Sequence, residues 1–299
     1  MKVIFPISLI AVCFSMFISS CSDLNSDPGL SFEAQLAKDT TAIGTYLRSK
    51  SITAQKDASG LRFVIDSLAS GFAPRNSGTV KFKYVGRFLS GAIFDQGEIT
   101  GPVNTFVAGF QIALSLLTEG SKGKFYIPSG YAYGESGSTG IPPNSILIFE
   151  ITLLDIVTSE TEKQRLATDT VAIDNTLNTK AIIAIKDKTG IRYVITQSGS
   201  GSTPDIYSKV KINYTGKLIS TGDVFFTGSS QPSDAFDSRV INFLPGFQAV
   251  IPKLNAGSKV TVYIPSGLAF GAQTFTSGSV SIAANSNLIY DIELVSFVN

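Results

Sequence analysis

The feature of this sequence that most constrains its fold is an internal repeat. Residues 60–65, GLRFVI, return 130 positions later as GIRYVI in residues 190–195. Residues 127–130, IPSG, return unchanged 137 positions later, in residues 264–267. The offset grows only where length is added between matching segments, as expected when insertions fall in surface loops. A repeat of this length predicts two domains that share one architecture.

The repeat also sets the expected domain boundaries. We predict a first domain over residues 32–158, with its core in residues 78–157, and a second over residues 159–299, with its core in residues 208–298. The sequence SETE at residues 159–162 fits a capping box that opens the leading helix of the second unit. A chain of 299 residues that is 43% apolar has room for two domains, each with its own hydrophobic core.

The hydrophobic pattern predicts the same element types in each unit. Residues 32–50 place four apolar side chains near one helical face: Phe32, Leu36, Ile43 and Leu47. Residues 60–65 and 80–86 alternate apolar and polar side chains, which is typical of half-buried strands. Residues 125–127 and 146–156 have the same character, and between them lies a loop of Gly, Ser and paired prolines.

The N-terminal segment predicts export and lipidation. Lys2 precedes an apolar run that is too short for a comfortable transmembrane helix, so residues 1–20 are expected to be a signal peptide. The run ends in MFISSC, which resembles a bacterial lipobox with Cys21 as the lipidated residue; an alternative is cleavage nearby, with Cys21 there by chance. Residues 21–31 are then a flexible tether. The protein is expected to be lipid-anchored in the bacterial cell envelope, and acidic residues in the tether favour the outer membrane.

The composition excludes several classes of function. The sequence contains no histidine, and Cys21 is the one cysteine outside the expected signal peptide, so no Ser-His-Asp triad, Cys-His pair, His-based zinc site or internal disulfide is possible. No Walker-type phosphate loop is present. The balance of 24 basic and 23 acidic residues argues against a nucleic-acid partner. We therefore expect no metal and no cofactor.

A series of motifs in the first unit resembles a known family. The motifs are V-x-x-x-Y-x-G at residues 80–86, Phe94 with Asp95, FVAGF at residues 106–110, YAYG at residues 131–134, IPPNS at residues 141–145 and LIFE at residues 147–150. Together they resemble the FKBP-type peptidyl-prolyl isomerase domain. The resemblance implies an α+β fold: two FKBP-like domains, each an antiparallel sheet wrapped around a short helix, here residues 110–117, and each preceded by an amphipathic helix.

The resemblance also implies an apolar pocket in the first domain. The implied catalytic residues are Tyr84, Phe94, Asp95, Phe110 and Tyr133. The implied wall residues are Phe106, Val107, Ile141 and Phe149. Phe110 forms the floor, where the family usually has tryptophan, and the Tyr133 hydroxyl faces a substrate carbonyl. The loop between Asp95 and Phe106 is short, which predicts an open rim.

The chemistry of such a pocket needs no nucleophile. Rotation about an X-Pro bond breaks amide resonance against a barrier of about 18–20 kcal/mol, and an apolar cleft favours the twisted amide over the planar one. Taken singly, each aromatic residue more often belongs to a core, and their joint occurrence favours the pocket. We predict isomerisation of X-Pro bonds in proline-containing exported polypeptides, mainly by the first domain. The alternative is a non-catalytic, lipid-anchored chaperone or surface-binding scaffold.

The second unit departs from the pattern. Its expected pocket residues are Tyr214, Phe225, Phe243, Leu244, Phe247, Phe270, Ile282 and Tyr290. Phe270 stands in place of Tyr133, and alanines replace the paired prolines. Either Phe225 and Phe226 replace the Phe-Asp pair, which loses the acid, or residues 236–237 restore it through the inserted loop. Pro252 should shorten the short helix. We predict a folded copy with weak or no activity.

Overall fold

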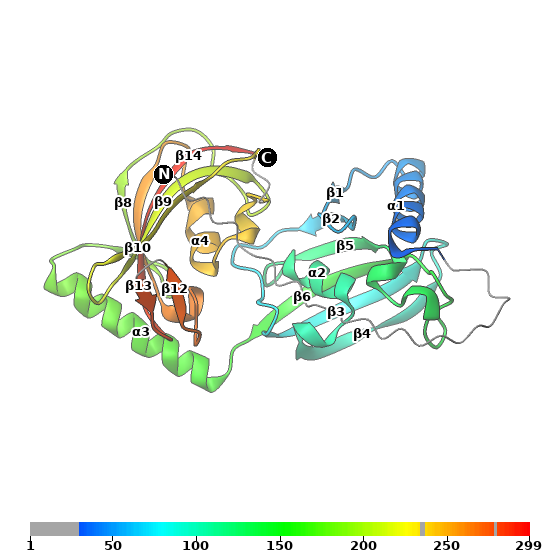
Figure 1. Ribbon diagram of the computed structural model, residues 1–299, viewed down its shortest axis with the longest axis horizontal. Coiled ribbons are helices and arrows are strands. Elements are labelled where there is room, and N and C mark those ends of the chain that lie inside the picture. Colours follow the sequence, from blue (N-terminus) through cyan, green and yellow to red (C-terminus); the bar gives the residue numbers. More distant parts are fainter. Residues whose placement is uncertain (1–29, 234–236, 278–279) are drawn as a thin grey trace, which may run out of the picture.

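The computed structural model describes residues 30–233, 237–277 and 280–299. The signal peptide, the lipidation of Cys21 and the tether up to residue 29 are expectations that lie outside the described residues. Within those described ranges, no helix has the length and apolar content needed to span a membrane. Two units lie side by side along the longest axis of the molecule (Figure 1).

The first unit is a six-stranded antiparallel sheet with one helix at each face. Helix α1 (Phe32–Ser49) precedes the sheet, as its amphipathic pattern predicted. The strands are β1 (Gln55–Lys56), β2 (Arg62–Ser67), β3 (Thr79–Phe88), β4 (Ile93–Pro102), β5 (Lys122–Ile127) and β6 (Leu147–Val157). They pair in the order β1-β2-β5-β6-β3-β4. Helix α2 (Ala108–Ser115) follows the short helix η1 (Val103–Thr105).

The second unit repeats this topology. Helix α3 (Glu160–Thr179) leads, and its N-terminus carries the predicted capping box between Ser159 and Glu162. The strands are β7 (Ile185–Lys186), β8 (Arg192–Gln197), β9 (Lys209–Leu218), β10 (Val224–Ser230), β11 (Lys259–Ile264) and β14 (Leu288–Val298). They pair in the order β10-β9-β14-β11-β8-β7, which is the order of the first sheet read from its other end. The two sheets and their helices confirm the predicted α+β fold.

The second unit differs from the first at its short helix and in the later insertion, and its edge strand β10 has seven residues where β4 has ten. Helix α4 (Pro245–Val250) has six residues where α2 has eight. Pro252 lies in the short helix η5 (Ile251–Lys253) that follows. The shorter helix agrees with the prediction made from the fixed φ and missing N–H of Pro252. The later insertion contains a small hairpin of β12 (Phe275–Ser277) and β13 (Val280–Ile282).

One expectation for the first unit is wrong. The residues after Asp95 were expected to form a short loop, but β4 continues to Pro102, paired with β3 along its whole length. A run with three glycine or proline residues reads as a loop in isolation. This run has a low intrinsic preference for a strand, but its pairing with the long neighbouring strand β3 holds it extended.

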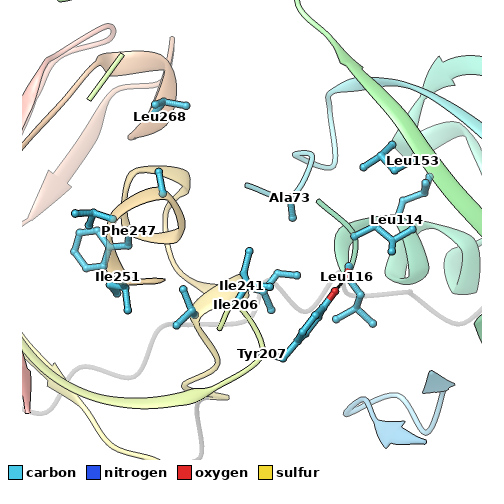
Figure 2. Packing of buried hydrophobic residues seen from close by; sticks show 14 of the residues in the cluster. Ala73, Leu114, Leu116, Leu153, Ile206, Tyr207, Ile241, Phe247, Ile251 and Leu268 are labelled. Carbon is cyan, nitrogen blue, oxygen red and sulfur yellow. Dashed lines mark hydrogen bonds between the residues drawn. The ribbon is translucent and has the colours of Figure 1, made fainter. Parts of the chain in front are cut away.

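The hydrophobic core runs through both units without interruption. Tyr207 of the second unit is 8% exposed, and its hydroxyl donates a hydrogen bond to the carbonyl of Leu116 at the end of α2. Figure 2 shows Tyr207 reaching toward Leu116 while Ile206 and Ile241 lie beside it. Burial of Tyr207 raises the pKa of its phenol, because the interior disfavours the charged form.

Polar contacts also join the units. The Ala73 amide donates to Gln248 Oε1 at 2.8 Å, and Arg75 Nη2 donates to the Ala269 carbonyl at 2.7 Å. Gln248 is 5% exposed and also donates to the carbonyls of residues 241 and 243. A segment of the first unit therefore satisfies a buried side chain of the second unit's short helix α4.

Candidate functional site

A cavity of about 240 Å³ lies between the first sheet and helix α2. Its lining residues are Phe82, Tyr84, Phe94, Asp95, Ile99, Thr105, Phe106, Val107, Phe110, Tyr133 and Phe149. They come from β3, β4, η1 and the residues that join it to α2, from α2 itself, from the loop after β5 and from β6. The fold therefore brings together segments up to 67 positions apart. The cavity is mostly aromatic.

Phe110 is the centre of the aromatic cluster. It is 5% exposed, and its ring centroid lies 4.9 Å from that of Phe149 in an edge-to-face arrangement and 5.1 Å from that of Phe82. Phe94 also meets Phe149 edge to face, at 5.6 Å. Gly86 makes this packing possible, because a Cβ there would lie 2.5 Å from the Phe94 ring. Edge-to-face contacts of this kind add stability beyond burial and hold the walls in place.

One polar pair interrupts the apolar lining. The Tyr84 hydroxyl donates to Asp95 Oδ2 at 2.7 Å, and the Gln96 amide donates to Asp95 Oδ1 at 2.9 Å. Burial and then the contact with Asp95 raise the pKa of Tyr84 to about 12, because both disfavour the phenolate. The tyrosine is therefore a neutral donor throughout the physiological range, and the carboxylate is oriented at the rim.

The raised pKa of Tyr84 predicts how the first domain responds to high pH. Below about pH 10 the phenol is protonated in both the folded and unfolded states, so pH does not alter its contribution to stability. Between pH 10 and 12 the unfolded state loses this proton first, and folding stability should fall. Urea unfolding at pH 9 and pH 11 measures this loss. Tyr84→Phe should lose less stability over the same interval, and an equal loss would contradict the prediction.

The loop that carries Tyr133 is closed on itself. The Gly137 amide donates to the Tyr133 carbonyl at 3.1 Å, and the Asn144 amide donates to the Gly134 carbonyl at 2.8 Å. Gly137 has φ +64°, and a Cβ there would lie 2.5 Å from the Ile141 carbonyl oxygen, so no other residue fits this turn. The loop therefore holds Tyr133 against the cavity by backbone contacts.

Helix α1 fixes the start of the same loop. Asp39 is 2% exposed, and its Oδ2 accepts hydrogen bonds from the amide and hydroxyl of Ser129 at 2.7 and 2.6 Å. Gln35 Nε2 donates to the other carboxylate oxygen at 2.7 Å. Phe32 meets Tyr131 edge to face, with centroids 5.6 Å apart. The sequence pattern marked α1 as a packing helix and did not indicate its buried carboxylate.

We expect Asp39→Asn to lower activity through this loop. In the asparagine, an NH2 group would replace one carboxylate oxygen and would face a hydrogen-bond donor, either Gln35 or Ser129. This mismatch costs about 1–3 kcal/mol of stability and loosens the turn before Tyr133. A fivefold loss of kcat/KM, about 1 kcal/mol, is expected in a peptide isomerisation assay. Asp169 makes the same contacts with Ser266 in the second unit, so Asp169→Asn is the matched control and should lose stability alone. Equal activity losses in the two variants would contradict a positioning role for Asp39.

The structure brings most of the predicted site residues of the first domain together. Tyr84, Phe94, Asp95, Phe106, Val107, Phe110, Tyr133 and Phe149 all line the cavity. Ile141 is 8% exposed and packs in the adjoining core rather than among the lining residues. Sequence reasoning missed Phe82, Ile99 and Thr105 as lining residues. The alternation of Phe82 with Tyr84 along one strand face was a signal that could have identified the first of these.

The second unit assembles a corresponding aromatic cluster. The Phe247 ring lies 4.8 Å from Tyr290, 5.5 Å from Tyr214 and 5.9 Å from Phe243. Phe225 lies 5.7 Å from Tyr290 and 6.4 Å from Phe270. Ile282 is fully buried, and Leu244 packs against the same core. The predicted residues therefore meet, as they do in the first unit.

The polar rim differs between the two units. In the first, Asp95 pairs with Gly86 across the sheet, and in the second, Phe226 occupies the same register position opposite Gly216. Phe226 stacks on Tyr214 with centroids 5.7 Å apart. The nearer spacing of the two sequence alternatives is thus the observed one, and the acid is lost. Phe270 stacks on Phe275 of the inserted hairpin at 5.0 Å.

Asp237 does not restore an acid at this rim. Its carboxylate pairs with Arg239, with Nε to Oδ2 at 2.7 Å. Arg239 also lies 3.8 Å from the Asp57 carboxylate and over the Phe63 ring of the first unit. Asp237 therefore belongs to the boundary between the units, and Phe236 lies outside the described residues.

Fold and site together define a class: a tandem pair of sheet-and-helix domains, each with an aromatic cluster between the sheet and a short helix. The chain belongs to the FKBP-type peptidyl-prolyl cis-trans isomerase family, whose model matches residues 71–154 and 201–295, more than half of the sequence. The two matched regions correspond to the two units of the repeat.

Individual relatives match the chain over part of its length. The isomerase FkpA of Aeromonas hydrophila is 38% identical over 103 residues, which cover 33% of this chain and 38% of that protein. The FKBP-type 22 kDa isomerase of Escherichia coli K12 is 33% identical over 132 residues, or 42% of this chain and 63% of that protein. A peptidyl-prolyl isomerase structure from Pseudomonas syringae is 28% identical, with a TM-score of 0.37, and covers 45% of this chain and all of that one. The chain thus spans less than two thirds of the length of these two sequence relatives.

Proposed function

We propose that this chain catalyses cis-trans isomerisation of X-Pro bonds and that the cavity of the first domain carries the activity. The observation that supports this most directly is the Tyr84–Asp95 pair at the rim of an otherwise aromatic cavity, with Tyr133 beside it. The second unit has phenylalanine at both the Asp95 and the Tyr133 positions. The second cluster therefore lacks the carboxylate and the hydroxyl that Asp95 and Tyr133 supply in the first.

The proposed mechanism is binding of the twisted amide in preference to the planar one. An apolar wall does not solvate the planar, resonance-stabilised amide, and the proline ring fills the space above Phe110. The Tyr133 hydroxyl, held by its closed loop, donates to the substrate carbonyl. Each 1.36 kcal/mol of preference for the twisted state is worth about tenfold in rate, so a modest preference suffices. No proton moves and no covalent bond forms.

Exchange of the rim residues between the two units tests the assignment. Magnetisation-transfer NMR measures the cis-trans exchange rate of a short X-Pro peptide in the presence of the full chain. The double variant Asp95→Phe, Tyr133→Phe gives the first domain the rim of the second and should lower the catalysed rate at least tenfold. The variant Phe226→Asp, Phe270→Tyr should leave it unchanged or raise it. A folded first double variant with full activity would exclude the first cavity as the site.

A second candidate function for the second unit is binding of apolar segments without catalysis. Phe226 and Phe275 are 43% and 46% exposed next to its aromatic cluster. Large exposed aromatic side chains at one place favour contact with another apolar chain. An unfolded, proline-free polypeptide tests this function, because its protection from aggregation should weaken in Phe226→Ser, Phe275→Ser while isomerase activity is kept.

We also propose that the protein acts on exported polypeptides from a lipid anchor at Cys21, in the bacterial cell envelope and at its outer membrane. The support is the short apolar run that ends in a lipobox-like sequence. Stable anchoring needs more than one acyl chain. Mass spectrometry of the mature N-terminus in the native host tests the proposal, and an unmodified Cys21 would exclude it.

A further inference from the structure

The first domain contains two neighbouring cations on one face of its sheet and a third cation beside a glycine of α1. Lys56 of β1 pairs directly with Arg62 of β2, so their side chains leave the same face of the sheet as immediate neighbours. Gly44 of α1 is half-buried, and a Cβ built on it would lie 3.5 Å from Nη1 of Arg48. Like charges directly opposite on a sheet repel each other unless an anion lies between them.

These cations have no acidic partner in the part of the chain that the structure describes. No ion pair there involves Arg48, Lys56 or Arg62. Arg48 donates to the neutral hydroxyl of Thr45 at 3.1 Å. Nη1 of Arg62 is buried and has no hydrogen-bond partner among the described residues. A buried guanidinium nitrogen without an acceptor is an unsatisfied donor that requires an explanation.

The second domain holds a corresponding pair of cations with an anion built in. There, Nη1 of Arg192 donates to the carbonyls of Gly190 and Ile191, and its Nε and Nη2 face the anion. Lys186 and Arg192 pair across β7 and β8 as Lys56 and Arg62 do across β1 and β2. Asp174, 130 positions after Gly44, accepts from Lys186 Nζ at 2.9 Å. Arg192 reaches both oxygens of the same carboxylate, with Nε at 2.8 Å and Nη2 at 3.2 Å. The hydrogen bond from Arg192 is the largest of the effects that lower the pKa of Asp174 to about 2.

The copies therefore differ first in one missing carboxylate side chain. Where α3 carries a carboxylate, α1 carries Gly44, and the cations that hold that carboxylate in the second domain are present in the first. Arg48 adds a third cation where the second domain has the neutral Asn178. Lys56 and Arg48 are exposed and Arg62 is half-buried, so solvent reaches the site.

We propose that Arg62, Lys56 and Arg48 bind a carboxylate group of another molecule at the place that Asp174 fills in the second domain. The planar fork of an arginine matches the two oxygens of a carboxylate, as Arg192 does. The ligand class is a carboxylate, borne either by a small molecule or by an acidic residue of a polypeptide.

The site lies on the sheet face opposite the catalytic cavity. Helix α1 packs through Ile43 and Leu47 on Tyr126 and Ile148, whereas the neighbouring residues Phe125 and Phe149 belong to the core on the cavity side. Successive strand residues point to opposite faces. A carboxylate bound beside Gly44 therefore leaves the cavity open, and its binding is independent of the proposed isomerase activity.

The Nε–Hε NMR signals of Arg62 and Arg192 in the full chain test the proposal, with sodium acetate as the probe and sodium chloride at equal ionic strength as the reference. The Arg62 signal should shift saturably with acetate, while the Arg192 signal stays in place. Gly44→Asp should abolish the acetate response of Arg62, whereas the isosteric, uncharged Gly44→Asn should retain part of it. Asp174→Gly should make the Arg192 signal respond to acetate.

A peptide with one glutamate and its glutamine counterpart distinguish the two sources of the carboxylate. A shift by both acetate and the glutamate peptide assigns a polypeptide ligand, and a shift by acetate alone assigns a small carboxylate. The proposal is wrong if Arg62 responds equally to chloride, responds to phosphate and not to acetate, or responds unchanged in Gly44→Asp. If Gly44→Asp does not fold, the acetate shift of the Gly44 amide must vanish in Arg62→Gln, and its persistence overturns the site.

Discussion

Phe110→Ala is expected to lower kcat/KM for X-Pro isomerisation by at least tenfold. The ring centroid of Phe110 lies within 5.5 Å of those of Phe82, Phe106 and Phe149, and the ring closes the floor of the cavity. Loss of transition-state contact equal to one aromatic pair, about 1.4 kcal/mol, already corresponds to a factor of ten. The truncation of a buried phenylalanine also costs about 3–5 kcal/mol of stability. Peptide exchange rates measured well below the unfolding temperature report the effect.

Phe247→Ala is the matched control for this variant. Phe247 occupies the same place in the second unit, is 2% exposed and lies 4.8 Å from Tyr290. Its truncation should cost similar stability and leave the isomerase rate of the folded protein unchanged. A loss of activity in Phe247→Ala as large as that in Phe110→Ala would mean that both clusters catalyse. Full activity in folded Phe110→Ala would exclude the first cavity.

Tyr207→Ala is expected to separate the unfolding of the two units. Tyr207 is buried at their boundary, where it donates to the Leu116 carbonyl and lies 5.9 Å from the Phe63 ring. Removal of a buried aromatic side chain costs about 3–5 kcal/mol of stability. Because Tyr207 packs between the units, this loss weakens the interaction between them. Calorimetry should show one transition for the natural protein and two for the variant.

Tyr207→Phe isolates the hydrogen bond from the packing. It keeps the ring and removes one donor, so a loss of about 0.5–1.5 kcal/mol with a single transition is expected. Two transitions in the natural protein would show that the boundary does not couple the units. An unchanged transition in Tyr207→Ala would show that Tyr207 contributes little to it.

The boundary is specific to this order of the two copies. Tyr207 and Ile206 correspond to Ser77 and Asn76 of the first unit, and Leu116 corresponds to Lys253 of the second. The polar counterparts could not form the same apolar contact. The residues that join the units therefore differ from their counterparts. In contrast, the hydrogen bonds that Ser129 donates to Asp39 and Ser266 donates to Asp169 match in the two units.

At the rim of each aromatic cluster, the backbone positions match between the units but one side chain differs. Gly86 and Gly216 leave the same space for Phe94 and Phe225, so both units keep the aromatic packing. The next residue in each strand is Asp95 or Phe226. A change at one register position therefore separates a rim with a hydrogen-bonded acid from one with a stacked ring, while the pairing with the neighbouring strand stays the same at that position.

The sequence alone determined the repeat, the leading helices and the strands of the first unit other than β1 and β4. These follow from local patterns: a 130-residue offset, alternation along strands and a capping box are all readable in one dimension. The resemblance to the FKBP family placed Tyr84, Asp95, Phe110 and Tyr133 together. Local patterns also predicted that Pro252 would shorten the second short helix.

Only the tertiary structure decided which residue takes the place of the acid in the second unit, because that depends on strand register rather than on spacing. It also showed that residues after Asp95 continue a strand, that Tyr207 joins the units and that Arg62 lacks the carboxylate held by its counterpart. Each of these depends on contacts between segments far apart in the sequence. Such contacts are set by packing and hydrogen-bond satisfaction in three dimensions, which no local pattern encodes.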